Sequence, residues 1–184
     1  MLILSGGSHE SHILNAGNKM LPKSLLACAL AGAIFPAYVA NAAVVPQLSF
    51  SQLVRDSQYI VEGRITSSYA EWDRSRTAIW THYRVEILDA LKGPAPRSLE
   101  ICEPGGEIGG VGMLIPGMVQ YAVNEHVVVF LQKVPNGYLR TYGMQQGKVA
   151  IGDSTLRSSV KQLDGLDLAN LKQKVRTEAA RAAR

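Results

Sequence analysis

The amino-acid sequence predicts a mainly β fold, a small barrel or sandwich of about five or six strands with a short N-terminal helix and a C-terminal helix. Three observations predict it. Apolar side chains recur with a period of two in several segments between residues 61 and 152, helical spacing occurs only near the two ends, and no helical pattern lies between successive strands. Because parallel strands need a crossover, usually a helix, a βαβ arrangement is not expected.

The first 42 residues predict an export signal. Leu25 to Phe35 form an 11-residue apolar run that follows Lys23, and Ala40 and Ala42 occupy the two positions where a signal peptidase accepts only small side chains. We expect cleavage after Ala42 and a periplasmic or secreted mature chain. As a helix the apolar run rises about 16 Å, which is too short for a hydrocarbon core of about 30 Å. No later apolar run is longer, so the mature chain is expected to have no transmembrane segment.

Two other interpretations apply to the same region. Cys28 follows Leu25-Leu26-Ala27 and offers a lipoprotein site, although hydrophobic sequence continues beyond it. Met20 starts an ordinary signal peptide, so residues 1–19 are interpretable as a mis-called start. With Cys28 removed, Cys102 alone remains, which excludes an internal disulfide. Cys102 is expected to be a small buried side chain rather than a reactive one.

Charge divides the mature chain into a β domain at residues 43–160 and a C-terminal amphipathic helix with a basic tail at residues 161–184. The first part carries eleven acidic and eleven basic residues, whereas the second carries three acidic and six basic ones. A neutral body lacks the positive surface that nucleic acids require, so no nucleic-acid partner is expected.

The spacing of apolar residues, together with capping and turn residues, predicts the individual helices and strands. A short helix is expected over Ser49–Ser57 with Ser49 as its cap, and the last helix is expected to begin after Asp167 and to pack through Leu168, Leu171 and Val175. Val127–Leu131 is continuously apolar and predicts a central strand covered on both faces. The other strands are expected at Val61–Thr66, Ile79–Ile87, Leu99–Pro104, Tyr138–Tyr142 and Gly147–Gly152. A five-stranded OB-like barrel is the first interpretation and an open sandwich the second.

Residues 103–117 (EPGGEIGGVGMLIPG) contain six glycines. A P-loop needs a lysine and a hydroxyl residue after its last glycine, and a dinucleotide fingerprint leads into a helix, which Pro116 prevents. Both nucleotide sites are excluded. The glycine pairs are expected to take positive φ angles in two tight turns or bulges that present Glu107 between them. The functional alternative is that Glu107 and backbone N–H groups bind a partner. The four glycines concerned are Gly105, Gly106, Gly109 and Gly110.

A second glycine-containing stretch, Gln145-Gln146-Gly147-Lys148, offers amide and ammonium donors after a predicted strand. Two hypotheses apply to Gln145, Gln146 and Lys148. They orient a polar ligand, or they make side-chain-to-backbone hydrogen bonds that fix a hairpin.

Catalytic chemistry has little support in the sequence. His82 and His126 are the candidate metal ligands, but no two histidines have the i, i+4 helical spacing of zinc hydrolases, and there is no G-x-S-x-G motif. His82 is expected to be solvated or ion-paired, and Glu100 and Glu103 to face solvent. No cofactor or metal is predicted. Trp72 and Trp80 either form an aromatic platform or cover an end of the barrel.

Four stretches in order carry a resemblance to a known family. They are LVRDSQYIVEGRI at 53–65, LKG at 91–93, PGGEIGG at 104–110, and NEHVVVFL followed by GMQQGKVAI within 124–151. Over most of residues 50–152 the chain resembles a family of uncharacterised exported bacterial proteins, a resemblance that implies no activity, cofactor or catalytic residue. The first two stretches also look like the start of netrin-type OB-fold domains, which include metalloproteinase inhibitors.

The leading functional hypothesis is a secreted or periplasmic, non-catalytic β domain that binds an envelope or extracellular protein. One alternative is a metal-assisted hydrolase that uses His82 and His126. The other, implied by the netrin-like opening, is an inhibitor of an extracellular protease. For the C-terminal helix, packing on the β domain is favoured over binding to anionic lipid.

Overall fold

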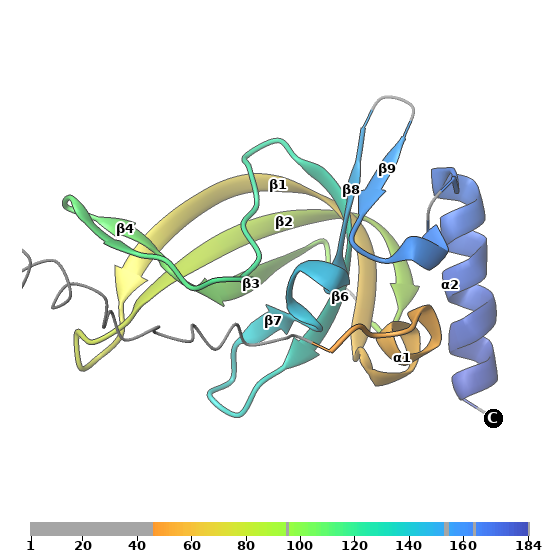
Figure 1. The fold of residues 1–184 in the computed structure, drawn as a ribbon, viewed down its shortest axis with the longest axis horizontal. Coiled ribbons are helices and arrows are strands. Elements are labelled where there is room, and N and C mark those ends of the chain that lie inside the picture. Colours follow the sequence, from red (N-terminus) through yellow and green to blue (C-terminus); the bar gives the residue numbers. More distant parts are fainter. Residues whose placement is uncertain (1–45, 95, 153–154, 164, 184) are drawn as a thin grey trace, which may run out of the picture. The chain divides into compact units, whose positions relative to one another are not determined.

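The computed structural model describes residues 46–94, 96–152, 155–163 and 165–183, which belong to one compact unit (Figure 1). The predicted signal peptide, its cleavage after Ala42 and the lipid site at Cys28 lie outside the described residues. None of the described helices has the length and apolar character that crossing a membrane requires.

The first helix, α1, spans Phe50–Asp56 and begins where the sequence predicts. The Ser49 hydroxyl accepts the backbone N–H of Gln52, and the Gln52 side chain accepts the N–H of Ser49, which completes a capping box. At the other end, Lys92 Nζ donates to the backbone carbonyls of Val54, Arg55 and Ser57 at 2.7–2.9 Å. A lysine from the end of a distant strand thus satisfies the last carbonyls of this helix.

Seven antiparallel strands form one sheet in the order β3-β2-β1-β6-β8-β9, with β7 paired to β6. A separate two-stranded sheet contains β4 and β5. A mainly β fold with one helix before the strands and one after them is therefore confirmed. The bounds are β1 Tyr59–Trp72, β2 Ile79–Lys92, β3 Ser98–Pro104, β4 Gly106–Ile108, β5 Val111–Met113, β6 His126–Lys133, β7 Leu139–Thr141, β8 Lys148–Ile151 and β9 Leu156–Ser158. Two 3-10 turns, η2 Met144–Gly147 and η3 Lys161–Leu163, precede the last helix, α2 Leu168–Ala182.

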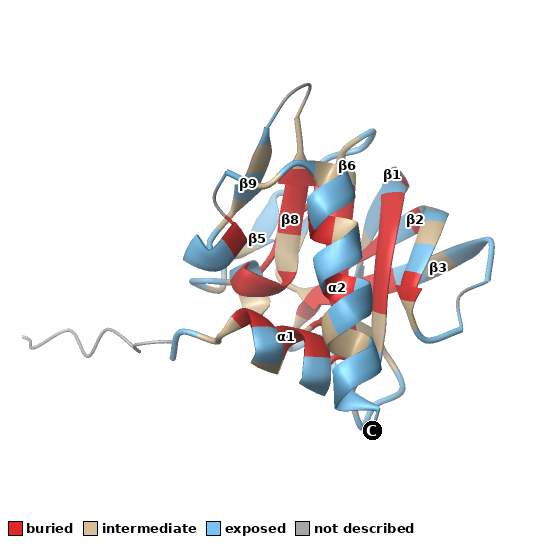
Figure 2. Cartoon of the chain, turned by 90° about the vertical axis from the view of Figure 1, so that its right-hand side faces the viewer, coloured by how far each residue is buried: buried red, intermediate tan, exposed pale blue. Residues whose placement is uncertain are grey.

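Strand β6 separates two cores, as its continuously apolar sequence predicts. Val128 and Phe130 point to one side, where α1 and α2 cover the sheet, and Val127 and Val129 point to the other (Figure 2). The outer core consists of Phe50, Leu53, Val54, Ile60, Leu91, Val128, Phe130, Val149, Val160, Leu163, Leu171 and Val175. The inner core consists of Val61, Ile65, Tyr83, Val85, Ile101, Val119, Tyr121, Val127, Val129 and Leu131.

The sheet is strongly curved but does not close, which corrects the first interpretation of a closed barrel. In the described part of the chain, β3 pairs with β2 and β7 pairs with β6, but β3 and β7 do not pair with each other. Instead, the Glu103 carboxylate on β3 accepts the backbone N–H of Thr141 on β7 at 2.7 Å. Because a side chain occupies the position of a backbone acceptor, the ladder stops there and the sheet remains open.

Strand β1 is longer than expected. The predicted strand covers Val61–Thr66, whereas β1 continues to Trp72 and pairs with β2 along its whole length. Irregularities in the register, including one between Ile65 and Ser67, bend the strand pair. The connection that follows is held by Asp73, whose carboxylate accepts the N–H groups of Thr77 and Ala78. These hydrogen bonds, with those from Ser75 and Thr77 hydroxyls, lower the pKa of Asp73 to about 2.

Candidate functional site

The glycine hairpin, residues 105–114, is formed by β4, β5 and the turn between them. Gly109 and Gly110 take φ angles of 59° and 81° at the turn, and Gly105 and Gly106 take 111° and 138° at its base. All four predicted positive φ angles are therefore confirmed. A Cβ atom on Gly106 would lie 2.4 Å from Thr81 Oγ1, so this position also needs glycine for close packing.

Backbone contacts fix the base of the glycine hairpin to β2 and leave its tip free. Gly105 donates its N–H to the carbonyl of Ile79, and the Thr81 hydroxyl donates to the carbonyl of Gly105. Beyond this base, Glu107 is exposed, Val111 is 53% exposed and Leu114 is 80% exposed. The structure thus presents Glu107 as the sequence predicts, and it exposes two apolar side chains on the same hairpin.

The Gln145, Gln146 and Lys148 side chains bind the protein itself. Gln145 donates to the carbonyl of Met118, and Gln146 accepts the N–H of Leu48 while donating to the carbonyl of Pro46. Lys148 Nζ donates to the carbonyl of Gln120 at 2.7 Å and pairs with Glu125 at 2.8 Å.

These contacts support the structural alternative for that stretch, although the segments they join differ from the expected hairpin. They fix the N-terminal residues 46–48 and the segment 118–125. Gly105 and Gly106 also border the latter segment, but Glu107 does not line the cavity there. Both glycine-containing stretches therefore contact residues 118–120.

That cavity has a volume of about 40 Å³ and is lined by Thr81, Tyr83, Glu103 and residues 118–120, among others. Its size suits a water molecule rather than a cofactor. Glu103, which was expected to face solvent, is 2% exposed and points toward this interior. Burial raises the pKa of Glu103, while hydrogen bonds from Thr141 and the Arg140 guanidinium oppose the shift. The expectation failed because Glu103 lies on the same side of β3 as Ile101 rather than on that of Glu100.

A second polar cluster surrounds His82. Its Nδ1 lies 2.8 Å from Glu100 Oε1 and its Nε2 lies 3.0 Å from Glu71 Oε1. The ring stacks on Tyr69 with centroids 4.7 Å apart, and it is 3% exposed. The expected contact with carboxylates is present, but the histidine is buried rather than solvated. With both nitrogens facing carboxylates, the protonated ring can donate to both.

Cys102 lies beside this histidine, with Sγ 3.5 Å from His82 Nε2. A cysteine and a histidine at this distance invite comparison with a catalytic pair, but the electrostatics oppose it. Burial, followed by the charges of Glu103, Glu100 and Glu71, raises the pKa of the Cys102 thiol to about 12. Reactive cysteines need positive surroundings that stabilise the thiolate. This geometry therefore favours the expected inert, buried thiol.

The other histidine belongs to a separate ion network beneath α2. His126 Nε2 lies 2.9 Å from Glu62 Oε1, and Lys172 Nζ lies 2.7 Å from Glu62 Oε2. Lys172 and Arg176 also pair with Asp89 on β2. Glu62 is buried because α2 covers its face of β1.

His82 and His126 are thus not brought together, since they contact different carboxylates. Among the residues that the structure describes, no group of three or more His, Cys, Asp or Glu side chains is arranged to hold a metal ion. Trp72 and Trp80 do not form a common platform. They pair with Ile79 and Glu71 respectively, so they lie on opposite faces of the β1–β2 ribbon.

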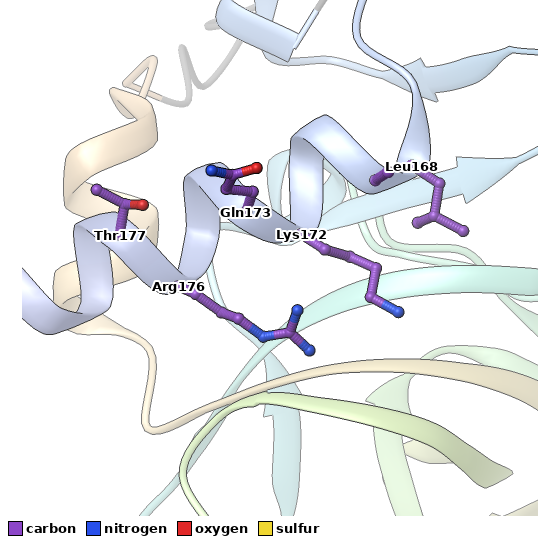
Figure 3. Close-up of a pocket in the computed structure, with 6 residues that line it drawn as sticks. Leu168, Lys172, Gln173, Arg176 and Thr177 are labelled. Atoms are coloured by element: carbon purple, nitrogen blue, oxygen red, sulfur yellow. The ribbon is translucent and has the colours of Figure 1, made fainter.

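A surface depression of about 600 Å³ lies along α2 (Figure 3). All six residues that line it come from this one helix, and its Lys172 and Arg176 side chains are already paired with Glu62 and Asp89. Leu171 and Val175 of the same helix are buried in the outer core. Packing of α2 on the sheet is therefore confirmed, and the depression offers neither a second wall nor a free cation.

Comparison with known proteins found no matching family model and no matching curated protein. The assignment of a site consequently depends on geometry and chemistry. In the described residues, the glycine hairpin combines an exposed charge with two exposed apolar side chains, and its two strands pair only with each other.

Proposed function

We propose that this chain is an exported β domain that acts by binding another protein rather than by catalysis, and that the glycine hairpin makes the contact. The observation that carries the proposal is the exposure of Leu114 and Val111 on a hairpin that pairs with no other described strand. Fully burying an aliphatic side chain contributes about 1.5–3 kcal/mol. Folding leaves these two side chains exposed to water. A partner that covers them therefore gains this free energy of burial as binding affinity.

The chemistry of the remaining polar groups supports binding over catalysis. His82 and His126 are each held by carboxylates, and the pKa of the Cys102 thiol is raised far above neutrality. A general base or nucleophile needs a free reactive atom at neutral pH. The clusters described above instead use their reactive atoms in internal contacts.

The same hairpin indicates what the partner offers. Val111 and Leu114 call for an apolar surface, and Glu107 calls for a lysine or arginine beside it. The export signal predicted for residues 1–42 supports an envelope or extracellular protein as that partner. The resemblance to exported bacterial proteins, carried in part by Pro104–Gly110, is consistent with this assignment.

A matched pair of variants tests the proposal. Leu114→Ser combined with Val111→Ser removes the apolar contact, whereas Leu88→Ser changes a leucine of β2 that is 51% exposed. The tagged proteins are incubated with envelope extract, and captured proteins are quantified by mass spectrometry. We expect the hairpin variant to lose a partner that the Leu88 variant and the unchanged chain retain.

Charge reversal at Glu107 provides a second measurement. Glu107→Lys is expected to weaken capture of that same partner by about tenfold, because it opposes a basic group with a like charge. Urea unfolding checks that each variant remains folded. Equal capture by all the folded variants would exclude the glycine hairpin as the binding element.

A further inference from the structure

A second cavity opens at the other end of β3 from the glycine hairpin. It has a volume of about 250 Å³, and its walls come from the starts of β1, β3 and β7 and from the end of β6. The floor is formed by Tyr59, Leu99 and Leu139, and Pro94 and Pro96 stand at the rim with Lys133. We call this cavity the sheet mouth.

The open edge of the curved sheet explains why the sheet mouth exists. Glu103 bridges β3 to β7 at Thr141, but nearer the start of both strands no described strand pairing joins them. Tyr59, Leu99 and Leu139 pack against the inner core and are only partly buried. The sheet mouth is therefore an apolar recess that is continuous with the inner core. It is not formed by surface side chains alone.

One charge stands at this recess. Lys133 lines it, and no ion pair is recorded for its ammonium group within the described residues. Its backbone N–H is fixed by Gln58, so the position of the residue at the end of β6 is set by the fold. An apolar recess with one unpaired cation at its edge complements a ligand that joins an apolar group to a carboxylate.

We propose that the sheet mouth binds the C-terminal residue of a peptide, with an aromatic or large aliphatic side chain in the recess and the terminal carboxylate on Lys133. Pockets for drug-sized ligands and cofactors measure about 300–1,000 Å³, so a cavity of this size suits one side chain. Capture of a C-terminal carboxylate is a known mode of peptide recognition. This site is independent of the binding function proposed for the glycine hairpin.

Small probes test each part of the site. The purified chain is titrated with N-acetylphenylalanine, with its C-terminal amide, and with N-acetylglycine, and binding is followed by amide chemical shifts in NMR spectra. We expect N-acetylphenylalanine to shift the amides of Tyr59, Leu99, Gly137 and Leu139. The amide probe, which lacks the charge, and the glycine probe, which lacks the side chain, are each expected to bind about tenfold more weakly.

Two variants separate the recess from the rest of the surface. Lys133→Gln is expected to bind N-acetylphenylalanine about tenfold more weakly and to remove the preference over the amide probe. Lys161→Gln, an exposed lysine of η3, serves as the control and is expected to bind as the unchanged chain does.

Other outcomes overturn the proposal. Equal binding of the acid and amide probes, or shifts outside the sheet mouth, would remove the carboxylate site. Hexanoate that binds as tightly as N-acetylphenylalanine would assign the recess to aliphatic acids instead of peptide ends. Because the glycine-hairpin variants leave the sheet mouth unchanged, they are expected to bind N-acetylphenylalanine normally, so the two proposals fail separately.

Discussion

Both halves of β1 pair with β2, but only residues 59–64 also pair with β6, and the two halves differ in what covers them. Residues 60–63 and 65 are buried between the inner core and the α2 side, whereas residues 66–69 are exposed (Figure 2). In the covered half even a carboxylate, Glu62, is buried and needs cationic partners. The comparison teaches that the residues of β1 that are free to contact another molecule lie where β6, the inner core and α2 no longer cover the strand.

The largest expected effect lies next to the covered half of β1, at Phe130, which pairs with Ile60. This residue of β6 is fully buried and meets Phe50 of α1 edge to face with centroids 6.4 Å apart. Phe130→Ala is expected to lower the free energy of unfolding by about 3–5 kcal/mol, because it leaves a cavity in the outer core. Urea denaturation measures this, and Leu114→Ala in the glycine hairpin is expected to change it by about 0.5 kcal/mol or less. Similar losses of unfolding free energy in the two variants would contradict the difference drawn between the covered and the exposed parts of the molecule.

A smaller loss is expected where α2 meets Glu62. Lys172→Met removes the ammonium group that pairs with Glu62 and Asp89 and leaves His126 as the remaining partner of the buried carboxylate. We expect a loss of about 2 kcal/mol, less than for a fully unpaired buried charge. Arg181→Met, which removes an exposed pair with Glu178 in the same helix, is the matched control and is expected to cost less than about 0.5 kcal/mol. An equal change in thermal midpoint for both variants would contradict the network's role.

The raised pKa of Glu103, whose side chain joins β3 to β7, predicts how the stability of the folded chain depends on pH. Its folded-state pKa is raised above the ordinary value of 4.5, so its contribution is fully present below that value and is lost as pH rises through the folded-state pKa. Each pKa unit corresponds to about 1.4 kcal/mol. Relative to Glu103→Gln, the unchanged chain should therefore lose stability as the pH is raised from 4 to 7. Parallel stability curves for the two proteins would show that burial of this carboxylate is not the cause.

The smallest effect is expected in the uncovered half, at the turn after β1. Hydrogen bonds lower the pKa of Asp73 to about 2, so its contribution is present above its ordinary pKa of 3.8 and is lost as pH falls through about 2. Asp73→Asn is expected to speed hydrogen exchange at the Thr77 and Ala78 amides with little change in global unfolding. Faster exchange in β6 as well would mean that this turn supports the covered half too.

The sequence was most informative where one residue's role depends on its immediate neighbours. The Ser49 and Asp167 caps, the β6 strand and the positive φ angles at Gly109 and Gly110 all follow from patterns within a few positions. Short β9 was missed because three residues carry too little periodicity to distinguish a strand from a loop.

The polar clusters were harder to predict from the sequence because they depend on the register between strands. His82 lies opposite Tyr69 on β1 and Cys102 on β3, and one residue of slip would move it to the other face. Glu103 was misjudged although it shares a face of β3 with Ile101. Its burial is completed by Thr141 and Arg140 of β7, which lie far along the chain. The apolar exposure of Leu114 had no sequence signal beyond its place after Gly112.

The hydrogen bonds of Gln146 to Pro46 and Leu48 join positions that are 100 and 98 residues apart in the chain. During synthesis these hydrogen bonds cannot form until η2 has been made. The segment around Pro46 therefore lacks them while most of the polypeptide is being synthesised.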